Sequence, residues 1–112
     1  MKKRMLGKRT GFEVTELGLG TWPLGGKDYD PMSESDAVST VEAYIETGGN
    51  LIDTAPAYAL SEAFIGKALA GKGIRDQLIV TTKTRQGDCI ETIPEMRKDL
   101  EQSLKALQTD YI

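Results

Sequence analysis

The chain has 112 residues, 39% of them hydrophobic, with 14 Lys and Arg against 17 Asp and Glu and a formal net charge of −3. This length predicts one domain, and the mildly acidic balance argues against a nucleic-acid partner and against a disordered chain. With no histidine, one cysteine (Cys89) and no apolar run near the roughly 18 residues of a membrane span, we expect a cytoplasmic protein without a membrane segment, a histidine-based triad, a metal site or an internal disulfide.

The first predicted elements are β-strands. Short apolar and polar alternation broken by glycines predicts a hairpin of roughly Met5 to Val14, with its turn at Thr10-Gly11. A strand around Glu16 to Thr21 follows. The next stretch, Trp22 to Met32, is rich in Gly, Pro and Asp and is therefore predicted to be an irregular loop.

Three amphipathic helices are predicted after this loop. The first begins at a capping box of Ser33 and Asp36 and stops at Gly48-Gly49, the second runs from about Ser61 to Gly71, and the third is capped by Thr92 and Glu95. Their apolar faces have the spacing of a helix: Ala37, Val38, Val41, Tyr44 and Ile45; Phe64, Ile65, Ala68 and Leu69; Ile93, Met96, Leu100, Leu104 and Leu107.

Buried strands are predicted between the helices, at Asn50 to Thr54 and Gln77 to Thr82, and Thr109 to Ile112 is predicted to open a fourth parallel strand. Strands alternating with helices predict parallel pairing with helical crossovers. Both an open doubly wound sheet and an arc of a (β/α)₈ barrel fit this alternation, although a complete barrel has about 250 residues. A last strand without a covering helix leaves an unpaired edge, so we expect an N-terminal part of a longer domain, or a sheet closed by association.

The candidate site lies where the predicted strands end. Gly20-Thr21-Trp22 follows the first strand, Asp53 ends the second and Lys83 follows the third, and in parallel α/β folds these ends face one rim. Neighbouring strands are about 4.8 Å apart, within ion-pairing reach for Asp53 and Lys83. An ammonium beside a phenol favours its ionised form, so we expect Lys83, held by Asp53, to make Tyr58 a proton-transfer group.

Each of these residues also fits a structural role by itself. Asp53 could form a turn or cap a helix, Lys83 could be a solvated strand end, Tyr58 could cover a helix start, and Trp22 could belong to the core. The set of three charged and phenolic groups favours the catalytic interpretation, because a structural role does not require all of them together.

Five segments resemble the aldo-keto reductases in order and spacing. They are L-G-L-G-T-W at 17–22, N-L-I-D-T-A-P-A-Y at 50–58, S-E-A-F-I-G-K-A-L at 61–69, I-V-T-T-K at 79–83 and S-L-K-A-L-Q-T-D-Y-I at 103–112. The resemblance extends over essentially the whole chain. It implies that residues 1–112 are the N-terminal part of one (β/α)₈ TIM barrel, a hairpin plus about three and a half βα units, with the hairpin closing the bottom.

The resemblance also implies an activity, the NADP(H)-dependent reduction of aldehydes or ketones to alcohols by direct hydride transfer. Asp53, Tyr58 and Lys83 match three members of the family's catalytic tetrad, with Tyr58 as the proton donor to a small-molecule carbonyl. Gly20-Thr21-Trp22 and Asp53 match positions beside the nicotinamide end of the cofactor, and Trp22 is also expected to border the substrate pocket.

The sequence departs from the family in three respects. The fourth tetrad member is a histidine after the fourth strand, and the chain stops at Ile112 before that position; the family's contacts to the adenosine phosphate lie further along its barrel. Ala59 stands where many relatives have Gly. We therefore expect the 112 residues alone to be inactive and to self-associate through exposed sheet edges.

Two alternatives to an enzyme stay open. One is a non-catalytic interaction subunit with the same barrel, as in the potassium-channel β subunits that share this fold. The other is a half-barrel whose free edge pairs with a further chain.

Overall fold

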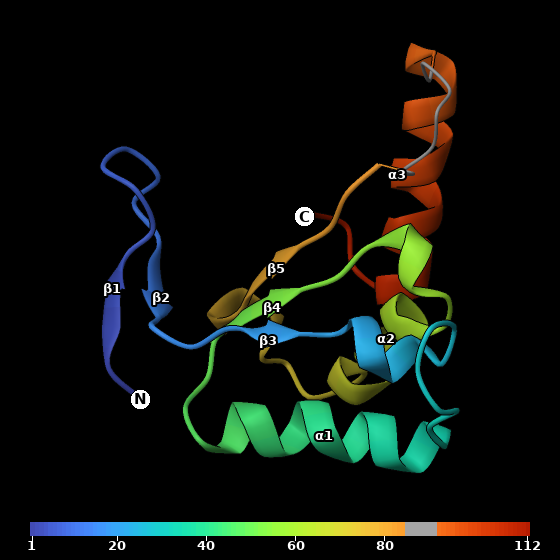
Figure 1. The fold of residues 1–112 in the computed structure, drawn as a ribbon. Coiled ribbons are helices and arrows are strands. Elements are labelled where there is room, and N and C mark those ends of the chain that lie inside the picture. The colour runs from blue at the N-terminus through green and yellow to red at the C-terminus, as the bar shows by residue number, and fades with distance from the viewer. Residues whose placement is uncertain (85–91) are drawn as a thin grey trace.

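The computed structural model describes residues 1–84 and 92–112, and Cys89 lies outside these ranges. A three-stranded parallel sheet has helices packed along one side, and an N-terminal hairpin stands apart from it (Figure 1). The elements are β1 (Lys3–Met5), β2 (Glu13–Thr15), β3 (Leu19–Gly20), α1 (Glu34–Glu46), β4 (Leu51–Asp53), α2 (Ser61–Leu69), β5 (Ile79–Thr81) and α3 (Ile93–Leu107), with short 3₁₀ helices η1 (Trp22–Gly25), η2 (Pro56–Tyr58) and η3 (Arg75–Gln77).

The predicted hairpin is present, but its turn is not the tight one expected at Thr10-Gly11. Antiparallel β1 and β2 pair Arg4 with Val14, and residues 6–12 form a longer loop closed by the Leu6 N–H on the Phe12 carbonyl at 2.8 Å. Gly7 and Gly11 both adopt positive φ, 70° and 71°, so the chain reverses in two steps instead of one. The buried Asn50 connects the hairpin to the sheet: its Oδ1 accepts the Thr15 N–H at 2.7 Å.

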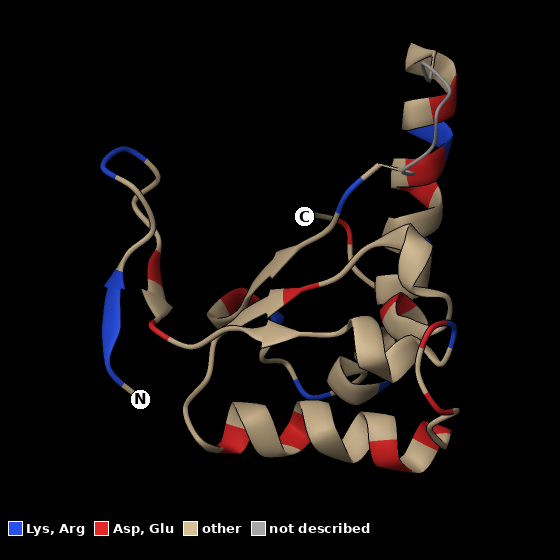
Figure 2. Ribbon diagram, viewed as in Figure 1, with Lys and Arg blue, Asp and Glu red and all other residues tan. Residues whose placement is uncertain are grey.

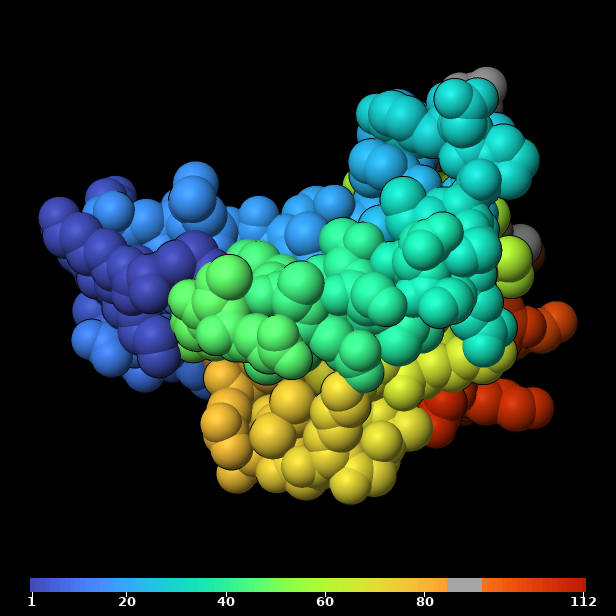
Figure 3. Space-filling model, turned by 90° about the horizontal axis from the view of Figure 1, so that it is seen from below, coloured from blue at the N-terminus to red at the C-terminus, as the bar shows by residue number. Residues whose placement is uncertain are grey.

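Positive charge concentrates on this hairpin (Figure 2). Glu16 follows β2 and pairs with Arg4 of β1 and, at 3.8 Å, with Lys2 just before β1. These side chains are exposed, so the pairs hold the strands together only weakly. Viewed from below, the hairpin projects at one end of the molecule and α1 covers the middle (Figure 3).

The three parallel strands pair in the order β3-β4-β5, and their register aligns Gly20, Asp53 and Thr81. The predicted common rim is therefore present. Side chains alternate across the sheet: Ile52 and Val80 are buried toward the helices, whereas Asp53 and Thr81 on the opposite face are half-buried. The helix side of the sheet holds the core and the other side leaves the strand ends accessible.

The strands are shorter than expected. Gln77, predicted as the first residue of a strand, instead ends η3, because the Gln77 and Leu78 N–H groups bond back to the Ile74 and Arg75 carbonyls. Residues Thr109 to Ile112 do not pair as a strand either. Instead, Arg75 donates to the Tyr111 carbonyl at 2.9 Å and lies over its ring, 4.1 Å from the centroid.

Helices α1 and α2 have the predicted faces. Ser33 caps α1 by accepting the Asp36 N–H at 3.1 Å, although the Asp36 carboxylate accepts the Ser33 hydroxyl and so the expected box is only half formed. The core cluster joins these two helices to the sheet: Leu24, Ala37, Val41, Ile52, Phe64, Ile65, Ala68, Leu69, Leu78, Val80 and Leu107.

Helix α3 differs from the prediction. Its capping box at Thr92 and Glu95 is present, but the apolar face expected to be buried is largely exposed: Ile93 by 76%, Met96 by 41% and Leu100 by 47%. The N-terminal half of the helix extends beyond the sheet (Figure 1), and no described residue covers it. Among the described residues, no helix combines the length and apolar character needed to cross a membrane.

Candidate active site

Asp53 is the last residue of β4, in register with Gly20 on one side and Thr81 on the other. Its Oδ1 accepts the Thr81 hydroxyl at 2.8 Å, and the Lys83 ammonium donates to Oδ1 at 2.9 Å and Oδ2 at 2.8 Å. The predicted ion pair between neighbouring strand ends is therefore formed. Both side chains are partly exposed, 47% for Asp53 and 40% for Lys83, so the pair is accessible at the rim.

Lys83 is held from several directions. Besides both Asp53 oxygens, its ammonium donates to the Thr54 carbonyl at 2.9 Å. Burial acts to lower the pKa of Lys83, but the hydrogen bond and negative charge of Asp53, with a smaller contribution from Tyr58, outweigh it and raise that pKa. Lys83 is consequently a fixed cation at neutral pH.

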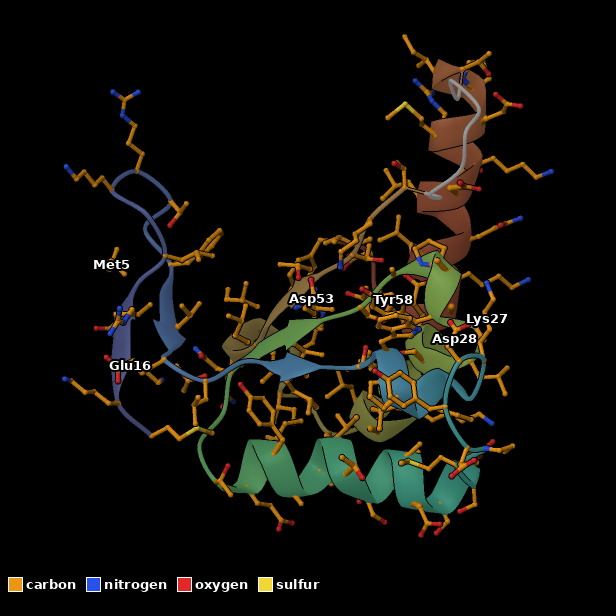
Figure 4. The ribbon with its side chains drawn as sticks, in the orientation of Figure 1. Met5, Glu16, Lys27, Asp28, Asp53 and Tyr58 are labelled. Atoms are coloured by element: carbon orange, nitrogen blue, oxygen red, sulfur yellow. The ribbon has the colours of Figure 1, made fainter. Side chains whose placement is uncertain are left out.

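Tyr58 ends η2 and is half-buried beside this cation. Pro56 opens the short helix, and the Tyr58 N–H bonds back to the Ala55 carbonyl at 3.0 Å. The Lys83 ammonium lies 5.1 Å from the centre of the Tyr58 ring, a cation–π distance. Figure 4 shows Asp53 and Tyr58 at the same end of the sheet. The structure thus brings together Asp53, Tyr58 and Lys83; their roles stay predictions.

The remaining predicted residues follow β3. Gly20 is exposed at the rim. Thr21 is fully buried, and both its N–H and its hydroxyl donate to the Asp53 carbonyl, at 3.1 and 2.9 Å. Trp22 is 44% exposed, so the alternative that it belongs to the core is wrong. Its ring stacks on Tyr58, with the ring centres 6.0 Å apart and the planes at 19°.

Several hydroxyl groups beneath the rim were not predicted. Ser61 donates to the Thr21 hydroxyl at 2.6 Å and lies 3.0 Å from that of Thr54, while Thr82 donates at 2.6 Å to the buried carboxylate of Glu62. They fix the strand ends to the start of α2. Two features of the sequence could have indicated these hydroxyls: Thr54 directly after Asp53, and Thr81-Thr82 directly before Lys83.

A cavity of about 330 Å³ lies beside Tyr58, lined by Trp22, Lys27, Asp28, Ala57 and Tyr58. Lys27 and Asp28 were not predicted as site residues, because they lie in a loop read only as irregular. Across residues 1–84 and 92–112, no group of acidic, histidine or cysteine side chains could hold a metal ion.

Comparison with known proteins places this geometry in context. The model of the aldo/keto reductase family matches residues 16–112. Aldo-keto reductase YhdN of Bacillus subtilis is 41% identical over 92% of this chain and 34% of its own length. An aryl-alcohol dehydrogenase (NADP(+)) of Phanerodontia chrysosporium is 32% identical over 99% of this chain and 34% of its own. The chain therefore spans about a third of the length of these relatives.

Solved structures of aldo-keto reductases resemble the fold of this chain. The thermostable aldo-keto reductase Tm1743, solved with the inhibitor epalrestat, superposes with a TM-score of 0.81 at 34% identity, covering 100% of this chain and 40% of Tm1743. Such neighbours are (β/α)₈ barrels, which confirms the predicted fold class and excludes the open doubly wound sheet. The three strands and their helices are part of a barrel.

Proposed function

The chain belongs to the aldo/keto reductase family, whose matched members are oxidoreductases, and from that premise we propose that its protein reduces aldehydes or ketones to alcohols with NADP(H). Hydride goes directly to the carbonyl carbon, and Tyr58 gives its proton to the oxygen. The substrate is a small carbonyl compound. We propose a cytoplasmic location as well, in keeping with the single cysteine.

The observation that supports this most is the contact of Lys83 with both Asp53 and Tyr58. Reduction of a carbonyl leaves an alkoxide, which needs a proton from a nearby acid. Tyr58 is the phenol in position, and the ammonium 5.1 Å from its ring stabilises the phenolate left behind. Asp53 and the Thr54 carbonyl fix the ammonium, so little reorganisation accompanies the proton transfer.

The rim residues fit the nicotinamide end of the cofactor. Apart from its chain neighbours, no described residue has an atom within 4 Å of the Cβ position at Gly20, which leaves room for a flat group beside Asp53. Trp22 would offer its ring, whereas Thr21 would act from beneath, since its N–H, its carbonyl and its hydroxyl are all bonded inside the protein. The bound cofactor would supply the hydride. The NADP(+) in the aryl-alcohol dehydrogenase's name supports NADP(H) as the choice.

A non-catalytic barrel subunit is the second candidate. Such a protein would have no need to keep Lys83 in contact with both Asp53 and Tyr58, and an exposed ion pair adds little to folding stability. Measured turnover distinguishes the two candidates.

Replacing Tyr58 by Phe in the intact protein tests the function. We expect kcat/KM for carbonyl reduction to fall about 10²- to 10⁴-fold, the usual contribution of a general acid. NADPH affinity, measured by fluorescence titration, should change little because the ring and its neighbours remain.

The control is Tyr111→Phe, a matched change at an exposed tyrosine whose ring lies under Arg75 and not beside Lys83. It should leave turnover unchanged. Equal activity in the two variants would remove Tyr58 from the acid role.

A further inference from the structure

The backbone of η1 is fixed at both ends against the segment that contains Asp53 and Tyr58. At its start, Thr21 bonds twice to the Asp53 carbonyl, at 3.1 and 2.9 Å. At its end, Gly25 lies so close to the Tyr58 carbonyl that no Cβ atom would fit between them. The position of Trp22 along the rim is thereby set, and only the rotation of its side chain is left to other contacts.

Two loop residues fix that rotation. The indole Nε1 donates to Asp28 Oδ2 at 2.9 Å, and the Tyr29 ring meets the indole edge to face, with centres 5.5 Å apart and planes at 88°. Since Trp22 is 44% exposed, burial alone does not hold it. A hydrogen bond to a charged acceptor is the stronger of these contacts, because it is directional and charge-assisted.

The indole so oriented is a wall of the cavity beside Tyr58. Trp22 and Tyr58 face one another in a near-parallel stack, and Asp28 with Lys27 completes the polar part of the lining. In the view of Figure 4, Tyr58 lies between Asp53 and Asp28. Asp28 therefore acts on the side of Tyr58 away from the ion pair.

We propose that Asp28 is a positioning residue: its carboxylate anchors the Trp22 indole over Tyr58, where the indole borders the bound carbonyl substrate. This inference rests on the function proposed above. Among the described residues, Asp28 is not bonded to Asp53 or Lys83, so its loss leaves their ion pair in place, and it acts on Tyr58 only through the indole. Its loss should weaken substrate binding more than it slows the chemical step.

The test compares three variants of the intact protein: Asp28→Ala, Asp28→Asn, which keeps an acceptor oxygen, and Asp30→Ala as a matched control. Trp22 is the only tryptophan of the 112 residues. Its near-ultraviolet circular dichroism is obtained by subtracting the spectrum of the same protein with Trp22→Phe. The KM and kcat for one carbonyl substrate are measured alongside.

We expect Asp28→Ala to lose most of the Trp22 signal and to raise KM about tenfold, the scale of one charged hydrogen bond. The kcat should fall much less. Asp28→Asn, which keeps an acceptor oxygen without its charge, should fall between Asp28→Ala and the unaltered protein. Asp30→Ala should resemble the unaltered protein in both measurements, because Asp30 is not bonded to the indole.

Either of two results overturns the proposal. A full Trp22 signal in Asp28→Ala means that the carboxylate does not anchor the indole. A lost signal with an unchanged KM means that the anchored indole does not border the substrate. If the unaltered protein reduces no carbonyl compound, the proposed function fails, and with it the substrate contact, while the spectra still decide whether Asp28 holds Trp22.

Discussion

Lys83 combines several polar contacts with a partly exposed side chain. Its ammonium bonds to Asp53 and Thr54, yet 40% of the side chain is exposed. Ion pairs this exposed contribute about 0–1 kcal/mol to folding, so stability alone does not account for the arrangement. The proposed reaction would account for it, because a fixed cation beside the Tyr58 phenol assists proton transfer.

Ala59, directly after Tyr58, is the strained residue of this site. Its φ of 49° and ψ of −110° are near the first central position of a type II′ turn, which glycine normally occupies. A non-glycine residue in such a conformation costs about 1–3 kcal/mol. The sequence showed only that Ala59 replaces a family glycine; the dihedral angles give the consequence.

We predict that Ala59→Gly stabilises the intact protein by about 1 kcal/mol, because relief of strain exceeds the added entropy of the unfolded chain. Urea unfolding measures the change. The matched control is Ala57→Gly, in the same loop without positive φ, which should destabilise by about 0.5–1 kcal/mol. An equal loss of unfolding free energy in both variants would contradict the strain at Ala59.

At the scale of elements, the site depends on how short segments meet. The parallel register aligns Gly20 and Asp53, and η1 then packs against η2 where Gly25 meets the Tyr58 carbonyl. A similar close approach joins α2 to α3, since a Cβ on Gly66 would clash with the backbone of Ala106 and Leu107. Both glycines allow contact between backbones, but only the first supports Tyr58.

This difference gives a paired prediction. Gly25→Ala and Gly66→Ala should each destabilise the protein by about 1–3 kcal/mol, as overpacking does. Only Gly25→Ala should also lower kcat/KM, by about 10²-fold, because it displaces Tyr58 by a distance on the order of 1 Å. Steady-state kinetics at a temperature where both variants are folded measures this. If Gly66→Ala loses as much activity, displacement of Tyr58 is not the cause.

At the scale of the whole molecule, two surfaces are incompletely covered. The exposed half of α3 presents Ile93, Met96 and Leu100, and these line a cavity of about 470 Å³ together with Thr82 and Lys83. Strand β5 pairs with β4 on one side, and no described strand pairs with it on the other. Free strand edges beside apolar surface promote association.

The 112-residue chain studied by itself should therefore self-associate, with a second copy covering the α3 face. Sedimentation velocity should show dimers or larger species that dissociate when Ile93 and Leu100 are both changed to Lys. Lys72→Ala removes a partly exposed ion pair between the turn after α2 and Glu42 of α1; it is the control and should not alter the association. A well-folded monomer at all concentrations would rule this out.

The sequence by itself determined the features that depend on local interactions. Apolar spacing and caps predicted the three helices, and alternation of strands with helices predicted the parallel order. Because parallel strands end at one edge, the meeting of Asp53 and Lys83 also followed from the sequence. These conclusions need only neighbouring residues and the geometry of regular elements.

Tertiary structure alone decided the rest. The Trp22 stack on Tyr58, the close approach at Gly25 and the bond between Ser61 and Thr21 join residues far apart in the chain. The Asp28 anchor is shorter in sequence, but it depends on the path of an irregular loop. Helix α3 likewise has the correct apolar period, yet what covers that face depends on the surrounding elements. Periodicity indicates which side of an element is apolar, whereas packing between segments determines which residues cover that side.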